Sequence, residues 1–577
     1  LRGGEEQTQG GVAPPTIRCT QEKAFHERLI DCCRMRMRMT EVHPRKGPAM
    51  SHPISRRSFV SSSLSATAAN SVRTDAAAGT RAPMEANTPP NILWIMTDQQ
   101  RYDCVGANGN QLIQTPNLDR LAAESANFSH AFVQSPVCTP SRACFFTGRY
   151  AHAHRCRVNY TVLNRSEVLL PQRLRDAGYD TRLVGKLHLA YQYPALPESA
   201  QQMGFDHVEL HDGSRHTDDW SDYVKWRNAK DPQAGIYYRK TIGDKARPGQ
   251  NPYTAIIDDE FTDTTWTGER TRAHLREAST QGKPFFLFSS YWKPHAPFEV
   301  PAPFDSLHNA DDMPLPAAVD TDNIESLPLP LQKLILRGNR KPFEMDRQQL
   351  LWAWRSYYAS ITHIDREVGR TLDLLDDLGL RDNTVVVFCS DHGDQMLEHG
   401  LMGKNVFFDE SIHVPLMIRA PGQIKRRRSN ELVESIDVMP TLFSLCGLDA
   451  PEHIQGRDLT PLLTGDGDFE SRDAVFSENI IPEVITIPGY QFDPDRGIAG
   501  IRHPDAKMVR TRKWKYNYYP EGYEELYDLD TDPKETRNLS AVKKGVAIEL
   551  RGRILDWLLT ASESEQIAEH WLVPWKA

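Results

Sequence analysis

Three unbroken apolar runs stand out along the chain, and each of them ends in polar residues. They are residues 91–96, 285–289 and 384–389. A short apolar run that does not alternate with polar residues indicates a strand buried on both faces, as in a mostly parallel sheet. The sequence therefore predicts a central sheet built from strands that lie far apart along the chain.

A long helix is expected between the second and the third of these runs. In residues 357–378 the apolar side chains recur at helical spacing and form one stripe. Gly379 follows as a stop signal, because glycine readily adopts the left-handed conformation that ends many helices. Helices that alternate with buried strands indicate an α/β fold, in which helices flank a mostly parallel central sheet.

The pattern of the chain changes after about residue 470. Residues 513–519 alternate like a half-exposed strand, and a second strand-like stretch follows at 525–529 after a turn. The aromatic side chains of the first stretch are assigned to packing in a sheet rather than to a platform for sugars. Residues 543–560 are expected to form a closing helix. We therefore expect a small C-terminal subdomain at 471–577 that contains a short antiparallel sheet.

The first 89 residues do not resemble a folded domain, and the α/β domain is expected to cover residues 90–470. Met50 is the expected translation start. Shortly after it, the pair Arg56-Arg57 precedes a segment rich in serine and alanine. This pattern is typical of a twin-arginine export signal, which the export machinery recognises and which is removed afterwards. The protein is therefore expected in the periplasm or outside the cell, unless an ordinary disordered leader holds the two arginines by chance.

The balance of charges argues against a nucleic-acid partner. The 577 residues carry a formal net charge of −9, with 25% charged and 39% hydrophobic residues. No domain-sized basic face is evident. The short basic run 425–428 is expected to be a solvated loop, or else a contact for an acidic glycan. No segment approaches the roughly 20 apolar residues that a membrane-spanning helix needs, so no transmembrane segment is expected.

The nine cysteines do not follow a zinc or disulfide pattern. No pair has the CxxC spacing, which argues against a zinc ribbon or a thioredoxin-type site. A dense disulfide framework is not expected in a chain of this length. Cys389 lies inside one of the apolar runs and is expected to be a buried free thiol.

Polar residues follow two of the predicted strands, at the position where open α/β sheets bind ligands. Asp98 and Gln99 follow the first apolar run, and Asp391 and His392 follow the third. Because the carboxyl ends of parallel strands meet at one edge of a sheet, these side chains are candidates for a shared site. Two carboxylates, an amide carbonyl and an imidazole suit a single divalent cation. The alternative is that each residue only caps a helix or a turn.

The segment 135–149 adds a cysteine to these candidates. It reads Ser-Pro-Val-Cys138-Thr-Pro-Ser-Arg142-Ala-Cys-Phe-Phe-Thr-Gly-Arg. This Cys-x-Pro-Ser-Arg core and its flanks resemble the signature of the type I sulfatases, in the alkaline-phosphatase-like superfamily. In that family a formylglycine-generating enzyme oxidises the cysteine to formylglycine (3-oxoalanine), whose aldehyde hydrate attacks the sulfur of a sulfate ester. The alternative is that Cys138 is an ordinary structural thiol.

Further segments fit this resemblance in chain order, from about residue 90 to about residue 540. The segment 185–188, Gly-Lys-Leu-His, resembles a second signature of the family, with leucine where an aromatic or other bulky residue is usual. The segments 293–298 and 400–404 resemble the stretches that hold the family's active-site histidine and lysine. The segments 435–441 and 526–539 resemble its structural C-terminal portion.

The resemblance implies a role for each candidate residue. The expected ligands of one divalent metal ion are Asp98, Gln99, Asp391, His392 and the group made from Cys138. Calcium is the expected ion, and manganese is the second. The expected catalytic residues are Cys138, Arg142, Lys186, His188, His295 and Lys404. Cations offset the negative charge of the sulfate group. His295 or Lys404 would protonate the leaving oxygen, and His188 would take a proton from the second hydroxyl of the hydrate.

Several polar residues near these segments have two interpretations. His154 and Asn159 follow the cysteine signature closely and are expected to line the substrate pocket, unless they belong to an ordinary polar loop. His363 and Asp365 lie on the predicted long helix and are expected to be surface or packing residues.

The sequence thus predicts a sulfuric ester hydrolase that acts on sulfated carbohydrates or on an aryl-type sulfate ester. A phosphonate monoester or phosphodiester hydrolase of the same superfamily is the first alternative. The two metal pairs of this sequence and its formylglycine cysteine also resemble that branch. A non-catalytic glycan-binding relative, with Cys138 unmodified, is the second. Against it stands the complete set of candidate residues, which a binding module need not retain.

Overall fold

The computed structural model describes most of the chain from residue 89 onward. Residues 83–577 form one compact unit. The expected start at Met50 and the pair Arg56-Arg57 lie outside the described residues. The described residues are 89–159, 161–191, 197–212, 220–232, 257–315, 347–465, 467–480, 505–519 and 522–561.

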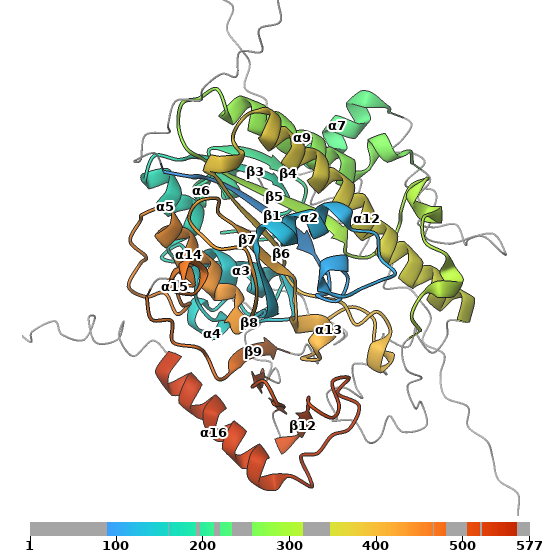
Figure 1. Ribbon diagram of the computed structural model, residues 1–577, viewed down its shortest axis with the longest axis vertical. Helices are drawn as coiled ribbons and strands as arrows, with labels where there is room; N and C mark the ends of the chain where they lie inside the picture. The colour runs from blue at the N-terminus through green and yellow to red at the C-terminus, as the bar shows by residue number, and fades with distance from the viewer. Residues whose placement is uncertain are drawn as a thin grey trace, which may run out of the picture. The chain divides into compact units, whose positions relative to one another are not determined.

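Within the described residues, eight strands form a central sheet in the order β4-β3-β5-β1-β6-β7-β2-β8 (Figure 1). The strands are β1 (Asn91–Asp98), β2 (Ala126–Phe132), β3 (Asp180–Gly185), β4 (His207–Leu210), β5 (Phe285–Pro294), β6 (Thr384–Ser390), β7 (Leu416–Arg419) and β8 (Arg427–Glu434). β7 runs antiparallel to both of its neighbours, whereas the other strand pairs are parallel. The prediction of a mostly parallel central sheet is confirmed.

The three apolar runs of the sequence lie side by side in the middle of this sheet. β1 lies between β5 and β6, and its Leu93 pairs with Leu287 on one side and with Val386 on the other. Every residue of these three strands is buried. Their side chains are apolar in both directions because helices cover both faces of the sheet.

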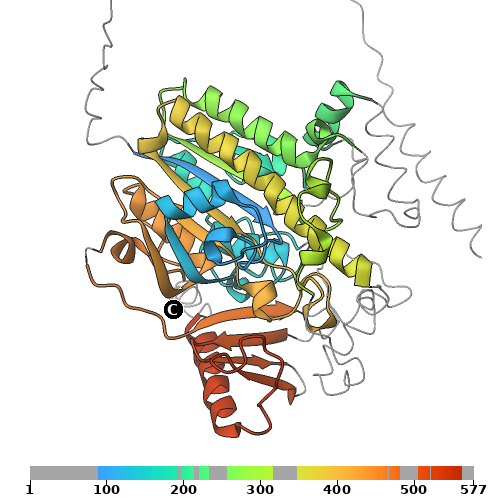
Figure 2. The ribbon, with the colours of Figure 1, turned by 45° about the vertical axis from the view of Figure 1, so that its right-hand side comes forward.

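One face of the sheet is covered by a layer that includes the longest helix (Figure 2). The helices of this layer are α2 (Pro116–Glu124), α7 (Asp222–Lys230), α9 (Asp263–Ala278) and α12 (Arg347–Asp377). Leu118 of α2, Trp266 of α9 and Ile364 of α12 pack in one hydrophobic cluster with Leu93 of β1. The long helix is therefore attached to the strand that carries Asp98.

The opposite face is covered by shorter helices. They are α3 (Cys138–Thr147), α5 (Leu170–Asp176), α14 (Val438–Leu445) and α15 (Thr460–Thr464), with α4 (Ala151–His154), α6 (Pro197–Gln202) and α13 (Asp409–Ile412) in the connections. Phe145 of α3, Leu170 of α5 and Leu442 of α14 pack in one cluster with Trp94 of β1. Leu93 and Trp94 are consecutive and point to opposite faces, which joins the two layers through one strand.

The helix α12 is longer than the sequence pattern predicted. The pattern placed a helix at 357–378, whereas α12 runs from Arg347 to Asp377. Leu351 and Trp354 extend it, because they pack in a separate hydrophobic cluster beyond the sheet. Gly379 has a φ of 68°, so the expected left-handed stop is confirmed.

A second, antiparallel sheet confirms the predicted C-terminal sheet. Its strands, in the order β12-β11-β10-β9, are β9 (Val475–Ile480), β10 (Asp505–Arg510), β11 (Trp514–Tyr518) and β12 (Glu524–Asp528). The helix α16 (Lys544–Ala561) packs on it through Leu550 and Trp557. Tyr516 and Tyr519 are at most 1% exposed, so these aromatic side chains pack in the interior as expected. The domain boundary at residue 470 stays a prediction.

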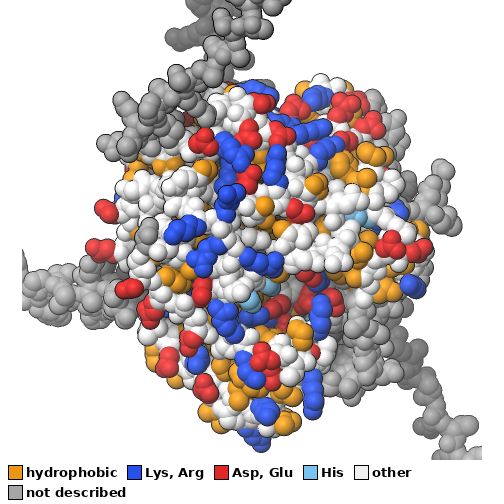
Figure 3. Space-filling view, viewed as in Figure 1, with side chains coloured by type: hydrophobic (Ala, Val, Ile, Leu, Met, Phe, Trp, Pro, Cys, Tyr) orange, Lys and Arg blue, Asp and Glu red, His pale blue; other side chains and the backbone are white. Residues whose placement is uncertain are grey.

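Smaller expectations are met only in part. The basic run 425–428 is exposed, but it is not wholly a loop, because Arg427 and Arg428 begin β8. Cys389 is buried and free, as are the other cysteines within the described ranges. None of the described helices has the length and apolarity to cross a membrane. On the face shown in Figure 3, lysine and arginine side chains lie among aspartate and glutamate side chains.

Candidate active site

Four neighbouring strands end at one edge of the central sheet and bring the candidate residues together. Asp98 is the last residue of β1, and Lys186, His295 and Asp391 follow directly after β3, β5 and β6. These strands are adjacent in the order β3-β5-β1-β6. Since they are parallel, their carboxyl ends lie on the same side, which is where open α/β sheets bind ligands.

Cys138 enters this site as the first residue of α3. Every residue of α3 is buried, and Cys138 is 1% exposed. The N–H of Thr139, one of the donors left unpaired by the first helical turn, donates to Oδ1 of Asn159 at 3.0 Å. The helix N-terminus carries a partial positive charge that favours a negative charge at position 138. Asn159 therefore lies beside the cysteine, where it caps the helix, and its contact with substrate stays a prediction.

Cys138, Asp98, Asp391 and His392 form a compact buried cluster whose ligand atoms all lie within 4.8 Å of one another. Sγ of Cys138 is 3.1 Å from Nε2 of His392 and 4.0 Å from Oδ1 of Asp98. Nδ1 of His392 lies 2.9 Å from the carbonyl oxygen of Gly393, which assigns the ring proton to Nδ1 and the lone pair to Nε2. Two carboxylates and an imidazole lone pair aimed at one point fit a divalent metal ion.

Gln99 is held next to this cluster by its backbone conformation. Its φ of 73° is left-handed, which is uncommon for a residue other than glycine. Its N–H donates to Oδ1 of Asp391 at 3.0 Å, and its carbonyl accepts from the hydroxyl of Tyr357 at 2.6 Å. Its side-chain amide donates to Asp394 and accepts from Nζ of Lys404 at 3.0 Å. The amide oxygen thus faces the charged groups of the site.

Three cationic side chains surround the cluster: Lys186, Lys404 and Arg142. Nζ of Lys404 lies 2.7 Å from Sγ of Cys138. Arg142 is wholly buried, and its Nε donates to Asp391 at 2.7 Å while Nη1 donates to the carbonyl oxygen of Lys186 at 2.7 Å. The guanidinium of Arg142 is therefore engaged by groups of the site itself.

These charges favour negative charge at the centre of the site. Burial opposes ionisation of Asp98, but the surrounding cations, Lys186 first among them, hold its pKa well below the usual value. Burial and the charge of Asp98 act to raise the pKa of the Cys138 thiol, yet Lys186 and Lys404 outweigh them and lower it. Burial disfavours the ammonium form of Lys404, but Cys138 and Asp98 raise its pKa. Shifts of this kind are typical of functional sites.

His188 follows β3 and lies at the side of the cluster. Its φ of 54° is left-handed, and its backbone N–H donates to the carboxylate of Asp212. Burial, followed by the charges of Lys186 and Arg142, lowers the pKa of His188 well below its usual value. Its imidazole is therefore neutral at pH 7, the form that can accept a proton.

His295 approaches Cys138 from the end of β5. Its Nδ1 lies 2.6 Å from the carbonyl oxygen of Ala296, and its ring interacts with the Cys138 thiol. Trp292 lies against it, with ring centroids 4.6 Å apart. The same indole ring lies 4.2 Å from Nζ of Lys186. Trp292 was missed by the sequence analysis, because nothing in the local pattern shows that one ring touches two candidate residues.

Three polar residues that hold the site in place were also missed: Ser290, Asp394 and Tyr357. Ser290 accepts from Nη1 of Arg142 at 2.9 Å. Asp394 accepts from the N–H of Gly403 at 3.0 Å, which fixes the loop that leads to Lys404. Asp394 follows Asp391 by three positions, and this proximity was an available signal. Ser290 and Tyr357 carry no such signal in the sequence.

His154 lies in the interior, 1% exposed. Its Nε2 is 3.4 Å from Sγ of Cys144, and its Nδ1 accepts from the N–H of Cys156 at 3.1 Å. These contacts are with neighbouring cysteines of the signature region rather than with Cys138. A contact between His154 and substrate stays a prediction.

His363 and Asp365 of α12 were expected to be surface or packing residues, and the structure shows that they are packing residues. His363 is 2% exposed and pairs with Asp259 at 2.8 Å. Asp365 is also 2% exposed, and it accepts from the N–H of Leu118 at 2.7 Å. Asp365 thereby satisfies a donor in the first turn of α2.

Two models of known protein families together match nearly all of the described chain. The model of the family Sulfatase matches residues 90–448. The model described as N-sulphoglucosamine sulphohydrolase, C-terminal, matches residues 397–556. The first range contains every residue of the cluster around Cys138.

Individual proteins show the same similarity. An arylsulfatase of Clostridium perfringens is 31% identical over 471 residues, which cover 78% of this chain and 90% of that protein. An N-acetylglucosamine-6-O-sulfatase of Bacteroides thetaiotaomicron is 27% identical, over 79% of this chain and 83% of that protein. Among solved structures, a phosphonate monoester hydrolase of Agrobacterium radiobacter has a TM-score of 0.70 and 26% identity, over 82% of this chain and 96% of that chain.

Proposed function

The chain belongs to the sulfatase family and is a sulfuric ester hydrolase, and from this premise we propose that it cleaves sulfate esters of carbohydrates with a nucleophile made from Cys138. One observation carries the proposal. Sγ of Cys138 lies at the buried N-terminus of α3, 2.7 Å from the ammonium of Lys404 and 3.1 Å from Nε2 of His392. A structural thiol gains nothing from a neighbouring cation, whereas a nucleophile is activated by one.

The nucleophile is proposed to be formylglycine, which a formylglycine-generating enzyme makes from Cys138 during maturation. Hydrated formylglycine supplies two hydroxyl groups, and Sγ of the unmodified cysteine marks their place. The N-terminus of α3 and the ammonium of Lys404 stabilise negative charge at that place.

One divalent metal ion is proposed to bind to Asp98, Gln99, Asp391 and His392, together with the group at position 138. When bound, it supplies positive charge that lowers the pKa of a neighbouring hydroxyl. Carboxylate and amide oxygens favour calcium, whereas the imidazole of His392 also suits manganese, so calcium is the first choice and manganese the second. Metal analysis of the purified protein, with Asp391→Asn as the variant that loses both metal and activity, tests this assignment.

The cations divide into two roles. Lys186 and Lys404, which lie beside Asp98 and Gln99, are proposed to offset the negative charge of the sulfate group. Arg142 is proposed to position the site, because its guanidinium is bound by Asp391 and by the carbonyl oxygen of Lys186. Charges placed before the reaction need no reorganisation, and the loss of one such contact commonly costs on the order of 10²-fold in turnover.

The proton transfers are proposed to use His295, Lys404 and His188. His295 or Lys404 protonates the leaving oxygen, since both lie next to position 138. The neutral imidazole of His188 accepts a proton from the second hydroxyl at that position.

The modification of Cys138 is the first test of this proposal. Mass spectrometry of the peptide 135–149 from active enzyme is expected to show an aldehyde in place of the thiol. Cys138→Ala is expected to lower turnover by about 10³-fold or more while the far-UV circular dichroism stays unchanged, because only the nucleophile is lost. Active enzyme that carries an intact cysteine would contradict the mechanism.

A second candidate function is hydrolysis of phosphonate monoesters or phosphodiesters. It is favoured by the similarity to the phosphonate monoester hydrolase of Agrobacterium radiobacter, at a TM-score of 0.70. A panel of sulfated sugars, an aryl sulfate and aryl phosphodiesters, assayed on fully modified enzyme, separates the two. Sulfate esters are expected to have the higher kcat/KM, and a phosphodiester or phosphonate that exceeds every sulfate ester would move the assignment to the second candidate.

Export through the twin-arginine route is proposed from the pair Arg56-Arg57 and its context. Replacement of both residues by lysine keeps the charge but removes the recognised pair, and it is expected to keep the protein inside the cell. Fractionation of cells that express each form is the measurement. Normal export of the double variant would contradict the export proposal and leave the enzymology unaffected.

A further inference from the structure

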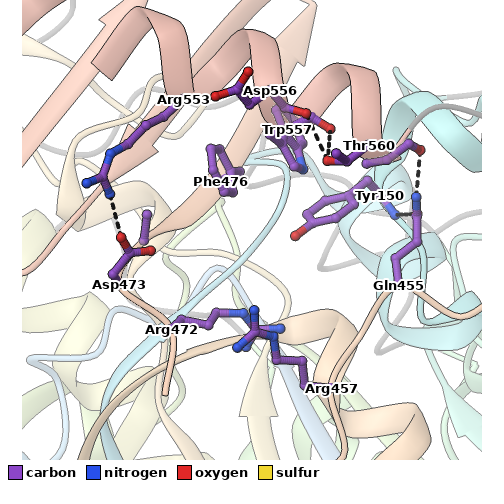
Figure 4. Close-up of a pocket in the computed structure, with 12 residues that line it drawn as sticks. Tyr150, Gln455, Arg457, Arg472, Asp473, Phe476, Arg553, Asp556, Trp557 and Thr560 are labelled. Atoms are coloured by element: carbon purple, nitrogen blue, oxygen red, sulfur yellow. Dashed lines mark hydrogen bonds and ion pairs between the residues drawn. The ribbon is translucent and has the colours of Figure 1, made fainter. Parts of the chain in front are cut away.

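A hollow of about 500 Å³ lies between α16 and the segment that follows α3 (Figure 4). Tyr150, which lines it, follows the C-terminal end of α3, whereas Cys138 begins that helix. A helix of ten residues is roughly 15 Å long. The hollow is therefore a separate site from the cluster around Cys138. Its volume is within the range of roughly 300–1,000 Å³ that is typical of small-molecule sites.

One wall of the hollow is aromatic. The rings of Phe476 and Trp557 are stacked, with centroids 4.8 Å apart and planes at 8°. Tyr150 meets Trp557 edge-on at 5.0 Å. Trp557 is 6% exposed, and within the part of the chain that the structure describes its indole N–H has no hydrogen-bond partner. The wall therefore combines ring surface with a buried donor that is not satisfied.

The opposite side of the hollow is cationic. Figure 4 shows Arg457 and Arg472 across the hollow from the rings. Arg472 is fixed by Asp437, 2.6 Å from its Nη2. Arg457 is exposed, and its guanidinium donates to the carbonyl oxygen of Glu470 at 2.9 Å. Among the described residues Arg457 has no carboxylate partner, so its remaining donors can bind an anionic group.

We propose that this hollow binds a saccharide that carries a sulfate or carboxylate group, as a second carbohydrate site remote from Cys138. The C–H face of a sugar ring suits the electron-rich face of an aromatic ring, and the partly exposed ring of Phe476 offers such a face. The anionic group then pairs with Arg457. Asp473 and Asp556 also line the hollow, and Asp473 is paired with Arg553 at 2.8 Å. Carboxylate oxygens can accept from sugar hydroxyls, and they repel a triphosphate more strongly than a saccharide with a single anionic group, which favours a saccharide over a nucleotide.

The choice of ligand rests on the proposed function, since a carbohydrate sulfatase meets sugars with several anionic groups. The test therefore uses a readout that does not depend on turnover. Hydrogen–deuterium exchange of the full chain is measured with a sulfated oligosaccharide, with the same oligosaccharide after desulfation, with a uronate oligosaccharide and with ATP. The proposal expects protection of residues 470–476 and 553–561 by at least one anionic saccharide, with little protection by the desulfated sugar or by ATP.

The variant Arg457→Gln tests the cationic side, because it removes the guanidinium at an exposed position. Its affinity for the protecting saccharide at the hollow is expected to fall by about tenfold or more. Arg512→Gln is the matched control, since Arg512 is also exposed and also donates to a carbonyl oxygen, that of Asn430 at 2.7 Å. Equal effects of the two variants, absence of protection in both segments, or stronger protection by ATP would each overturn the proposal. Failure of sulfate hydrolysis would leave this readout intact and would count against the proposed function alone.

Discussion

Single side chains hold the charged groups of the site at fixed positions, and Trp292 does so for two of them. The ammonium of Lys186 lies between the carboxylate of Asp98 and the face of the Trp292 ring. The same ring also lies against His295, at a centroid distance of 4.6 Å. An ammonium held against an indole in a buried site gains about 2 kcal/mol from the cation–π contact. Trp292 is thus a positioning residue for a cation and for a candidate proton donor.

The variant Trp292→Leu is expected to lower kcat by roughly tenfold or more with little change in KM, because about 2 kcal/mol of positioning is lost. Trp292→Phe keeps an aromatic face and is expected to recover part of the loss. The measurement is steady-state kinetics on an aryl sulfate. Trp226→Leu is the matched control, since the ammonium of Lys230 lies 4.1 Å from that ring at the surface. An equal loss of kcat in Trp226→Leu would show that the effect is not specific to Trp292 and would contradict its positioning role.

At the scale of secondary-structure elements, α12 connects the loop after β1, which belongs to the site, with the neighbouring helix α2. From this one helix, Tyr357 bonds to the backbone of Gln99 and of Arg101, at 2.6 and 3.0 Å. Two turns later, Asp365 bonds to the N-terminus of α2. The conformation of the loop after β1, left-handed at Gln99, is therefore imposed by a helix more than 250 residues away in the chain.

The variant Tyr357→Phe is expected to weaken the affinity for the divalent ion by about 10- to 100-fold, since it frees the loop that presents Gln99. The measurement is a metal titration of the metal-depleted protein. Tyr358→Phe is the control, because the hydroxyl of Tyr358 bonds to Asn110 at 2.9 Å instead. Equal metal affinities for Tyr357→Phe and the wild type would contradict the role assigned to Tyr357.

The helix contact made by Asp365 makes stability depend on pH. Burial raises the pKa of Asp365 to about 6, although N–H bonds from Leu118 and Asn117 oppose this. The unfolded pKa is about 3.9, so the folded state binds the proton more tightly, and this contribution to stability is present below about pH 4 and lost as the pH rises through 6. Relative to the wild type, Asp365→Asn should therefore gain up to about 3 kcal/mol between pH 4 and pH 7.

Urea unfolding of the wild type and of Asp365→Asn at pH 4, 5, 6 and 7 measures this difference. The exposed Asp373→Asn on the same helix is the control for the change from carboxyl to amide, and its effect on the free energy of unfolding is expected to be at most about 1 kcal/mol. A difference for Asp365→Asn that does not change with pH would contradict the assignment of the shift to this carboxyl.

At the scale of the whole molecule, buried ion pairs join the C-terminal sheet to the central one. Lys515 of β11 is wholly buried, and its ammonium pairs with Asp409 of α13 and donates to the carbonyl oxygen of Phe407 at 2.9 Å. Burial opposes ionisation of Asp409, but Arg510 and Lys515 hold its pKa below the usual value. The two sheets are therefore parts of one compact unit, which spans residues 83–577.

The variant Lys515→Met is expected to lower the free energy of unfolding by about 3–5 kcal/mol, because it removes a buried ammonium that pairs with both Asp409 and the buried Glu535. Differential scanning calorimetry is the measurement, because it gives the melting temperature and shows whether the chain unfolds in one transition or in two. Lys513→Met is the control, since Lys513 is half-exposed and pairs with Asp530 at 3.3 Å, and its effect is expected to be at most about 1 kcal/mol. An unchanged melting temperature for Lys515→Met would contradict the coupling.

The sequence by itself determined the fold class and named the candidate residues that lie together around Cys138. The unbroken apolar runs specified β1, β5 and β6, because a strand covered on both faces needs apolar side chains in both directions. The polar residues after these runs marked the edge where ligands bind. The segment around Cys138 showed the family, since its spacing is local and requires no knowledge of contacts.

Only the tertiary structure decided which distant side chains share the site. The candidate residues are contacted by Trp292, Ser290 and Tyr357, which lie on other strands and helices. Such contacts cannot be predicted from the local sequence. The same holds for the start of α12, which packing of Leu351 and Trp354 extends beyond the regular apolar stripe. Periodicity reports which face of an element is buried, whereas the partner against which it is buried is set by the packing of the whole chain.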